Sequence, residues 1–514
     1  MSSVSDSKGA CRQATVGVGA LSYLRDRVSS DAMSASAKPV EKDCYVGGSW
    51  RAAQDGRRFD VTDPATGELI DSAADASPAD GLTAVAAAHD ALQAWSRVAP
   101  RERGEILRRA FELMMARTDD LARLVVTENG KALADARAEM AYAAEFFRWN
   151  SEEAARISGE IVTAPAGTNR ILVLRQPIGV ALLVTPWNFP AAMLTRKIGP
   201  ALAAGCTLVC KPARETPFTA LAIAAILDEA GTPPGVVNVV PSSRPGPLID
   251  AVIADGRVRK LSFTGSTETG RALLARASER VLSCSMELGG NAPFIVFADA
   301  DLDAAVAGAM VAKMRNGGEA CTAANRFYVE ESVASAFSTR FAAAMAEIRM
   351  GNGLEDGVGL GPLVNAEARA RVATLVAGAL EVGARALTGG VIPDGPGYFY
   401  PATVLDRVAP GSPILKEEVF GPVAPIVTFQ SESEVIELAN DSILGLVSYV
   451  YTANLARGLK VAEALETGMV GLNRGLVSDP AAPFGGVKQS GLGREGGHEG
   501  MSEFLETKYV ACSW

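Results

Sequence analysis

Short apolar strands alternate with helical patterns along most of this 514-residue chain, and this alternation limits its fold more than any other feature. Residues 206–210 are typical of a buried strand, and the following helix has Thr216 as N-cap and Pro217 in its first turn. Residues 236–240 and 260–264 are further strands, each followed by a helical pattern. Because parallel strands are usually joined by helices, the pattern predicts an α/β fold with a parallel sheet covered on both faces.

A second alternating block begins with a strand at residues 293–297 and a helix that Asp301 caps. We therefore expect two α/β domains joined near residue 290. Residues 351–401 are rich in glycine and proline and are expected to form mainly loops. Residues 1–40 are rich in serine and alanine, and we expect a disordered tail there.

The composition excludes several classes of function. Asp and Glu number 59 against 49 Lys and Arg, and the net charge of −10 disfavours general binding of nucleic acid or of an anionic membrane. No apolar run reaches the roughly 18 residues that span a bilayer. The only histidines are His89 and His498, which excludes a zinc site with several histidine ligands, and no metal is expected. Any catalytic base is therefore sought among carboxylates and lysines.

The seven cysteines are odd in number and widely spaced, a pattern typical of a reduced protein, so we expect a cytoplasmic location. Cys206 and Cys210 lie in an apolar strand without a second pair, which favours core thiols over a metal pair. Cys321 lies in the small-residue segment 317–325, where a thiol can act as a nucleophile. A cysteine that only fills the core is the alternative at this point.

Three further segments contain residues suited to chemistry, each with a structural alternative. Residues 263–270 place a glycine turn at a helix N-terminus, where a phosphate can bind, or they form a plain tight turn. Residues 185–190, Thr-Pro-Trp-Asn-Phe-Pro, end a strand and either line a ligand crevice or form a rigid turn. Glu287 lies in an apolar stretch where burial would raise its pKa and suit a general base, or it is a surface residue.

Read together, these segments resemble the aldehyde dehydrogenase superfamily over residues 44–511. The matching elements are residues 185–190, Lys-Pro-Ala at 211–213, Phe-Thr-Gly-Ser-Thr at 263–267, Glu-Leu-Gly-Gly at 287–290, Cys321, Glu-Glu-Val-Phe-Gly-Pro at 417–422 and Pro-Phe-Gly-Gly at 483–486. The resemblance implies a Rossmann-like dinucleotide-binding domain and a second, catalytic α/β domain, with a small β element that forms a homodimer or homotetramer. The implied bounds are 41–158 and 179–289 for the first, 290–490 for the second, and 159–178 and 491–514 for the oligomerisation element.

The mechanism that the resemblance implies uses a thiol, an amide and a carboxylate. The Cys321 thiolate attacks an aldehyde, and the Asn188 amide and the backbone N–H of Cys321 hold the oxyanion. Hydride passes to a nicotinamide, leaving a thioester, and Glu287 activates the water that hydrolyses it. The residues expected to bind the dinucleotide are Thr185, Pro186, Trp187, Lys211, Arg214, Gly265, Ser266, Thr269, Leu288, Glu418 and Phe420.

Residue 214 bears on the choice between NADP and NAD. Members of the superfamily that prefer NAD often have a glutamate three residues after the lysine, where this chain has Arg214. A guanidinium attracts the 2′-phosphate of NADP, so NADP is the expected cofactor. NAD is the alternative, because Glu215 lies beside Arg214.

Within the superfamily, the succinate-semialdehyde dehydrogenases look most similar, through residues 193–197, 313–316, 323–326, 475–478 and 488–494. Arg196, Arg315 and Ser478 match positions that bind the distal carboxylate of that substrate, although surface ion pairs are the alternative for the arginines. The expected reaction is oxidation of succinate semialdehyde to succinate. Glutarate semialdehyde is an open alternative, because one methylene is worth only about 1–3 kcal/mol. A broader aldehyde dehydrogenase, a thiol esterase and a catalytically silent structural protein are further alternatives.

The chain departs from the superfamily pattern at three positions. Ala323 stands where several members have a second cysteine, so no disulfide is expected at Cys321. Glu319 replaces a glutamine, and a carboxylate facing Cys321 would raise the pKa of the thiol. Arg474 adds a cation beside the expected carboxylate pocket, which would broaden tolerance of longer acids.

Overall fold

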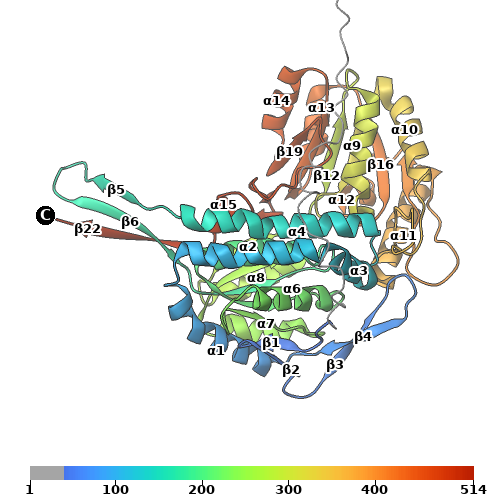
Figure 1. The fold of residues 1–514 in the computed structure, drawn as a ribbon. Coiled ribbons are helices and arrows are strands. Elements are labelled where there is room, and N and C mark those ends of the chain that lie inside the picture. Colours follow the sequence, from blue (N-terminus) through green and yellow to red (C-terminus); the bar gives the residue numbers. More distant parts are fainter. Residues whose placement is uncertain (1–39, 514) are drawn as a thin grey trace, which may run out of the picture. The chain divides into compact units, whose positions relative to one another are not determined.

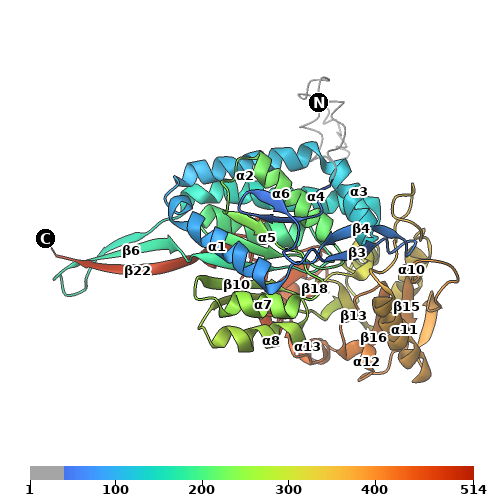
Figure 2. The same ribbon diagram turned by 90° about the horizontal axis from the view of Figure 1, so that it is seen from below.

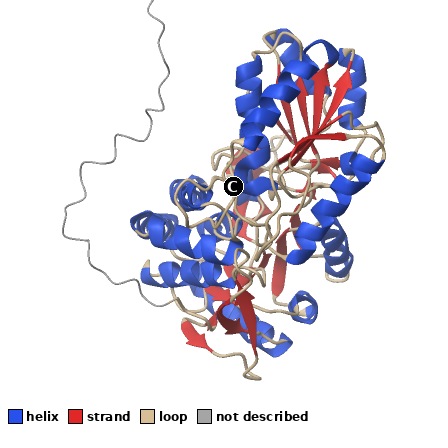
Figure 3. Ribbon diagram, turned by 90° about the vertical axis from the view of Figure 1, so that its right-hand side faces the viewer, coloured by secondary structure: helices blue, strands red, loops and turns tan. Residues whose placement is uncertain are grey.

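The structure, a computed structural model, describes residues 40–513, so the tail expected in residues 1–40 lies almost entirely outside the described residues. The described part contains two large sheets, each flanked by helices (Figures 1 and 3). This is the α/β fold that the alternation predicts. No helix within residues 40–513 is long and apolar enough to cross a membrane. The cysteines in this part of the chain are all free.

In the described part of the chain, the first sheet has eight strands in the order β2–β1–β9–β8–β7–β10–β11–β21. Its strands are β1 (Cys44–Val46), β2 (Ser49–Arg51), β7 (Val180–Val184), β8 (Thr207–Lys211), β9 (Val237–Val239), β10 (Val258–Thr264), β11 (Ser283–Glu287) and β21 (Gly491–Leu492). The parallel strands β9–β8–β7–β10–β11 have the order 3-2-1-4-5 of a Rossmann-like sheet. Ligands bind such sheets where the order reverses, which here is the carboxyl end of β7 and β10.

Helices cover both faces of this sheet, as Figure 2 shows from below. One face carries α1 (Pro78–Trp95), α7 (Pro245–Ala254) and α8 (Thr267–Ser278). The other carries α5 (Ala192–Ala204) and α6 (Pro217–Glu229), with α2 (Pro100–Ala116), α3 (Thr118–Asn129) and α4 (Leu133–Glu153) packed on them. Every residue of α5 is buried, because this helix lies between the sheet and the outer helices. At Gly199, a Cβ atom would lie 2.9 Å from the Asn150 amide of α4, so only glycine permits this close approach.

The second sheet of residues 40–513 has seven strands in the order β14–β15–β16–β13–β12–β18–β19. They are β12 (Ala292–Val296), β13 (Ala324–Glu330), β14 (Arg385–Thr388), β15 (Thr403–Asp406), β16 (Val423–Phe429), β18 (Val447–Tyr451) and β19 (Met469–Leu472). The helices α9 (Leu302–Met314) and α10 (Glu331–Ala346) pack on one face, and α11 (Ala366–Glu381), α13 (Glu432–Asn440) and α14 (Leu455–Ala464) pack on the other. The two sheets divide between β11 and β12.

Residues 351–401 are mainly loops, as expected, but they also contain the helix α11 and the strand β14, which were not expected. Asn365 caps α11 by accepting a hydrogen bond from the backbone N–H of Ala368. The apolar residues Val372, Leu375, Val376 and Ala379 recur at helical spacing and pack beneath the sheet. Glycine and proline on both sides of the helix obscured this period in the sequence.

A three-stranded antiparallel sheet projects from this body as an arm (Figures 1 and 2). It consists of β5 (Glu160–Thr163), β6 (Arg170–Pro177) and β22 (Leu505–Cys512), with β6 in the middle. The expected oligomerisation segment 491–514 begins before this arm, because β21 pairs with β11 in the first sheet. That the first domain binds a dinucleotide, that the second is catalytic and that the arm mediates oligomerisation remain predictions.

The remaining elements are short. They are the hairpin β3 (Arg58–Thr62) and β4 (Leu69–Ala74), the pair β17 (Leu444–Gly445) and β20 (Val487–Lys488), the helices α12 (Pro413–Lys416) and α15 (Glu499–Ser502), and the 3₁₀ turns Ala154–Arg156 and Arg315–Gly318. The second 3₁₀ turn leads directly towards Cys321 and β13. It therefore carries the expected nucleophile to the edge where β12 and β13 begin.

Candidate active site

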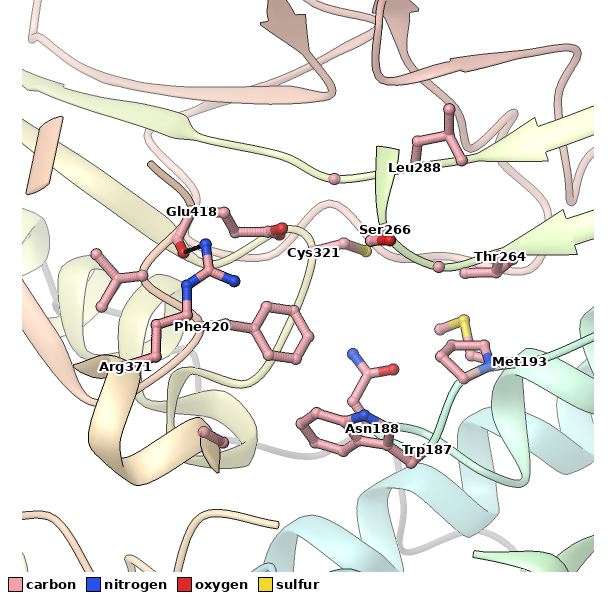
Figure 4. A pocket seen from close by; sticks show the side chains of 15 residues that line it. Trp187, Asn188, Met193, Thr264, Ser266, Leu288, Cys321, Arg371, Glu418 and Phe420 are labelled. Carbon is pink, nitrogen blue, oxygen red and sulfur yellow. Dashed lines mark hydrogen bonds between the residues drawn. The ribbon is translucent and has the colours of Figure 1, made fainter. Parts of the chain in front are cut away.

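A cavity of about 270 Å³ lies at the carboxyl ends of β7 and β10, where the order of the first sheet reverses (Figure 4). It brings together many of the residues expected from the sequence, namely Pro186, Trp187, Asn188, Gly265, Ser266, Leu288, Cys321, Glu418 and Phe420. Its other lining residues were not expected, and they are Met193, Thr264, Gly289, Ala368, Arg371 and Val419. The walls come from both sheets, so this site joins the two halves of the described chain.

Cys321 points into this cavity from the turn before β13 (Figure 4). Burial raises the pKa of its thiol to about 12, against the effect of the Arg196 guanidinium, which lowers it. The thiol therefore keeps its proton near neutral pH and needs a base to become nucleophilic. The backbone N–H of Cys321 donates to no acceptor among residues 40–513.

The Glu319 carboxyl is hydrogen-bonded to a segment distant in the sequence. Its Oε1 accepts a hydrogen bond of 3.2 Å from the backbone N–H of Val364, on the loop before α11. Burial raises the pKa of Glu319 to about 8. This carboxyl thus ties the segment before Cys321 to that loop.

Glu287 ends β11 with a side chain that is almost fully buried. Neither of its carboxyl oxygens has a hydrogen-bond partner within residues 40–513. Burial and the nearby Glu495 carboxylate raise the pKa of Glu287 well above its usual range, while Arg196 and Lys197 lower it. A buried carboxyl with a raised pKa and free oxygens is suited to accepting a proton from a thiol or from water.

The loop after β7 holds Asn188 in a network of hydrogen bonds. The Asn188 side-chain amide donates to the Glu319 carbonyl over 3.0 Å. Its backbone carbonyl accepts from the Lys131 ammonium over 2.7 Å and from the Asn316 amide over 2.8 Å. Lys131 forms a buried ion pair with Glu139 of α4, with 2.6 Å between nitrogen and oxygen. The position of Asn188 is therefore fixed from two separate segments, the end of α3 and the turn before Cys321.

Residues 128–131, Glu-Asn-Gly-Lys at the end of α3, form a clamp on this loop that the sequence analysis missed. Glu128 accepts hydrogen bonds from the first backbone N–H groups of α6. Asn129 donates from its side chain to the Trp187 carbonyl over 3.1 Å. The available signal was a polar run between two apolar helical patterns, because side chains at such a helix end often hold backbone groups elsewhere.

At one end of the site, Ser266 is the N-cap of α8 and accepts a hydrogen bond from Thr269. This N-terminus faces the cavity and suits a phosphate group. Lys211 ends β8 almost fully buried, with no carboxylate within ion-pair distance in the described chain, and burial lowers its pKa to about 8. Arg214 is 63% exposed and contacts Glu215 only over 3.8 Å. These groups are suited to binding the phosphate and ribose hydroxyl groups of a dinucleotide.

At the other end, Glu418 accepts a hydrogen bond from the backbone N–H of Gly290 over 3.2 Å, and burial raises its pKa to about 7. Phe420 has a φ of 52°, a conformation that non-glycine residues rarely adopt. Its ring lies edge-on to Trp187, with 5.4 Å between the centroids. A Cβ atom at Gly289 would lie 2.9 Å from Glu418, so glycine keeps this space open. The space beside Trp187, Phe420 and Glu418 fits a flat ring and a ribose.

The expected carboxylate-binding residues divide into two groups. Arg315 donates to the Ser478 hydroxyl over 3.1 Å, so the structure brings these two together. Arg196 is buried, forms an ion pair with Glu495 and stacks on Phe484, with 4.2 Å from its guanidinium carbon to the ring centroid.

Lys197 and Arg474 are two further basic residues, close to Arg196 and Ser478 in the sequence. Lys197, next to Arg196, also pairs with Glu495 and donates to the Ser262 hydroxyl over 3.0 Å. Arg474 is exposed and donates to the Leu476 carbonyl over 2.7 Å. In residues 40–513, no group of three or more His, Cys, Asp or Glu side chains is arranged to hold a metal ion.

Comparison with known proteins agrees with this geometry. Residues 50–510 match the sequence model of the aldehyde dehydrogenase family. The chain is 55% identical to succinate-semialdehyde dehydrogenase of Paenarthrobacter nicotinovorans over 87% of this chain and 99% of that one. It is 49% identical to glutarate-semialdehyde dehydrogenase of Pseudomonas putida over 93% of this chain and 99% of that one.

A solved structure described as an NADP-dependent enzyme of Escherichia coli superimposes with a TM-score of 0.91 and 47% identity. It covers 92% of this chain, and this chain covers 98% of it. The family match spans most of the chain, and the cavity brings a cysteine and an asparagine together where a Rossmann-like sheet reverses its order. This protein therefore belongs to the aldehyde dehydrogenase family.

Proposed function

We propose that this protein oxidises succinate semialdehyde to succinate with NADP as the hydride acceptor. The observation that carries the proposal is the pairing of Arg315 with Ser478 close to the Cys321 thiol. Arg315 has no carboxylate within ion-pair distance in residues 40–513. A positive charge that no carboxylate neutralises therefore lies near the proposed nucleophile. The similarity to a succinate-semialdehyde dehydrogenase supports this choice of substrate.

The first step is attack by the Cys321 sulfur on the aldehyde carbon, with the thiol proton passing to a buried base. Glu287 is the candidate base, because burial and Glu495 raise its affinity for a proton. The negative charge then lies on the aldehyde oxygen. The unused N–H of Cys321 and the Asn188 amide are the candidate donors to it, and such a donor contributes about 10²–10³ in rate.

A nicotinamide held in this cavity would supply the acceptor for the hydride of the former aldehyde carbon, and Cys321 would then carry the acyl group as a thioester. Trp187 and Phe420 are positioned to hold the ring, and Glu418 and Lys211 to bind ribose hydroxyl groups. Glu287 first passes the thiol proton on to solvent and then takes a proton from the water that attacks the thioester carbon. The carbon–sulfur bond breaks, the leaving Cys321 thiolate takes up that proton from Glu287, and succinate is released.

NADP is favoured over NAD by the exposure of Arg214. Its guanidinium is held only by a 3.8 Å contact with Glu215, so it is free to turn towards a 2′-phosphate. Both groups lie just after β8, the strand that ends in Lys211. The similar Escherichia coli structure, described as NADP dependent, supports the same choice.

Glutarate semialdehyde is the second candidate substrate, favoured by the similarity to the Pseudomonas putida enzyme. It carries the same two functional groups and one more methylene. Discrimination by one methylene is worth about 1–3 kcal/mol, so activity on both acids is expected.

The test is a panel of kcat/KM values for succinate semialdehyde, glutarate semialdehyde and the uncharged butanal, with NADP and with NAD. We expect either acid to exceed butanal by about 100-fold or more, because a paired arginine and hydroxyl contribute two charge-assisted bonds. Equal values for butanal and the two acids would reject a carboxylate site. No formation of reduced cofactor with any aldehyde would reject the reaction itself.

We also propose that the protein forms a homodimer or homotetramer in the cytoplasm. The outer edge of β22 is unpaired in the described chain. On the same arm, the exposed fraction is 73% for Ile161 and 59% for Tyr509. Exposed apolar side chains on an open strand edge favour pairing with another chain. Light scattering tests the assembly state, and a monomer would contradict it.

A further inference from the structure

Tyr142, on α4, has a buried hydroxyl that no step above uses. Its oxygen has no hydrogen-bond partner in the described chain. Burial raises the pKa of this hydroxyl, while Arg196, Arg315 and Ser478 lie close enough to lower it. The Arg315 guanidinium carbon also lies 5.6 Å from the centre of the Tyr142 ring. A buried polar group without a partner therefore faces the residues expected to bind the distal carboxylate.

The charges around Tyr142 are unevenly balanced. Arg196 is neutralised by Glu495, with which it forms a buried ion pair. Arg315 has no such partner within residues 40–513, and Asp135, the nearby acid, accepts a hydrogen bond from the Asn316 backbone instead. The Arg315 guanidinium and the hydroxyls of Ser478 and Tyr142 thus form a cluster with one uncompensated positive charge.

A carboxylate complements this cluster in both charge and hydrogen bonding. It accepts hydrogen bonds at about four lone-pair sites and donates none. Arg315 can donate to it, and both hydroxyl groups can turn their hydrogens towards it. Without an acid, the Tyr142 hydroxyl stays desolvated and unpaired, which is unfavourable. The cluster therefore both attracts an acid and disfavours an uncharged chain in the same place.

We propose that Tyr142 determines substrate specificity by donating a hydrogen bond to the distal carboxylate of the semialdehyde, beside Arg315 and Ser478. The inference rests on the proposed function and deepens it, because it adds a donor to the same site. Since α4 is a 21-residue helix packed on α2 and α5, this donor is held on a rigid element. Tyr142 binds substrate but takes no part in bond making or breaking.

The test compares Tyr142→Phe with the wild-type enzyme on succinate semialdehyde and on butanal. We expect kcat/KM for the acid to fall about 10- to 100-fold, mainly through KM, which is the effect of one hydrogen bond to a charged group. The value for butanal should stay the same or rise, because the unpaired hydroxyl is removed. The matched control is Tyr398→Phe, a partly buried tyrosine in the loop before β15, which should change neither value.

A second measurement does not depend on turnover of the acid. Succinate should inhibit butanal oxidation competitively, and Tyr142→Phe should raise its inhibition constant about tenfold. An unchanged constant, or an equal effect of the substitution on acid and butanal, would overturn the role of Tyr142.

Ser478→Ala and Arg315→Ala separate the two hypotheses. If they reduce the preference for the acid and Tyr142→Phe does not, the proposed function stands and the role of Tyr142 is wrong. If the wild-type enzyme shows no preference for the acid, both are wrong.

Discussion

Cys321 lies in surroundings that hold its thiol in the neutral form, with burial as the main cause. The proposed attack by Cys321 therefore depends on the groups around it, above all on Glu287, the proposed base. This view separates Cys321 from the other described cysteines, such as Cys210, whose pKa is also raised by burial but which lies inside the first sheet. The difference is access to the cavity and not the acidity of the thiol.

Replacing Cys321 by alanine should abolish formation of NADPH, because no other thiol of residues 40–513 lines the cavity. Binding of NADP, measured by fluorescence or calorimetry, should change by less than about twofold, since the side chain only borders the cofactor site. The matched control is Cys284→Ala, a half-buried cysteine of β11 that lies outside the cavity and should leave the rate unchanged. Retained turnover in the Cys321 variant would remove the proposed nucleophile.

The pH dependence follows from the raised pKa of Glu287. As a base, Glu287 must be deprotonated, so kcat should fall as the pH decreases through its raised pKa, well above the usual range for a glutamate. Glu287→Gln should lower kcat by about 10²–10⁴ and remove this acidic limb. An unchanged limb in the glutamine variant would assign the titration to another group.

Arg214→Glu should shift the cofactor preference towards NAD. The substitution removes a charge-assisted bond to the 2′-phosphate and adds an acceptor for ribose hydroxyl groups, so the ratio of kcat/KM for NADP to that for NAD should fall about 10- to 100-fold. The control is Arg259→Glu, an exposed arginine on β10. A ratio that does not change in the Arg214 variant would show that residue 214 does not contact the 2′ position.

At the scale of elements, the loop after β7 depends on two helices that lie outside the cavity. Lys131 follows α3 and Glu139 belongs to α4, and their ion pair is almost inaccessible to water. Lys131 holds the backbone carbonyl of Asn188, while Glu139 accepts from the backbone N–H of Ala191, at the start of α5. Asn188, the proposed oxyanion donor, is thus positioned by side chains that lie outside the cavity.

Lys131→Met leaves the Glu139 carboxylate buried without its partner, which costs about 3–5 kcal/mol of unfolding free energy. We also expect kcat to fall with little change in KM, because Asn188 loses one of the bonds that fix it. Urea unfolding and steady-state kinetics measure the two effects. Lys416→Met, on the exposed side of α12, is the control, and equal stability of the two variants would contradict the clamp.

The sequence predicted those elements whose signals are local. The strand β8 and the helix α6 follow from a short apolar run, a proline at the first turn and the helical period after it. Tyr142, Lys131 and Glu139 could not be assigned in this way, because their roles arise only when α4 packs across α5 and beside the loop after β7. The pairing of Arg196 with Glu495 depends on the C-terminal segment in the same way, since the two residues lie 299 positions apart.

At the scale of the molecule, the candidate active site lies where the two sheets meet. β7, β10 and β11 end there, and β12 and β13 begin there, so both sheets contribute walls to the cavity and the thiol comes from the second sheet. This edge explains why motifs separated by hundreds of residues converge on one cavity. It also explains why the sequence could indicate which residues matter without giving the contacts between Arg315, Ser478 and Tyr142.

The most direct test of this account is the effect of Arg315→Ala on the ratio of kcat/KM for succinate semialdehyde to that for butanal. The guanidinium is the one uncompensated charge in the cluster of Arg315, Ser478 and Tyr142, so we predict that the ratio falls about 100-fold or more. The value for butanal itself should change by less than about threefold, because Cys321 and Glu287 are intact. Equal losses for the two aldehydes would contradict the account, because Arg315 would then support the site without recognising the acid.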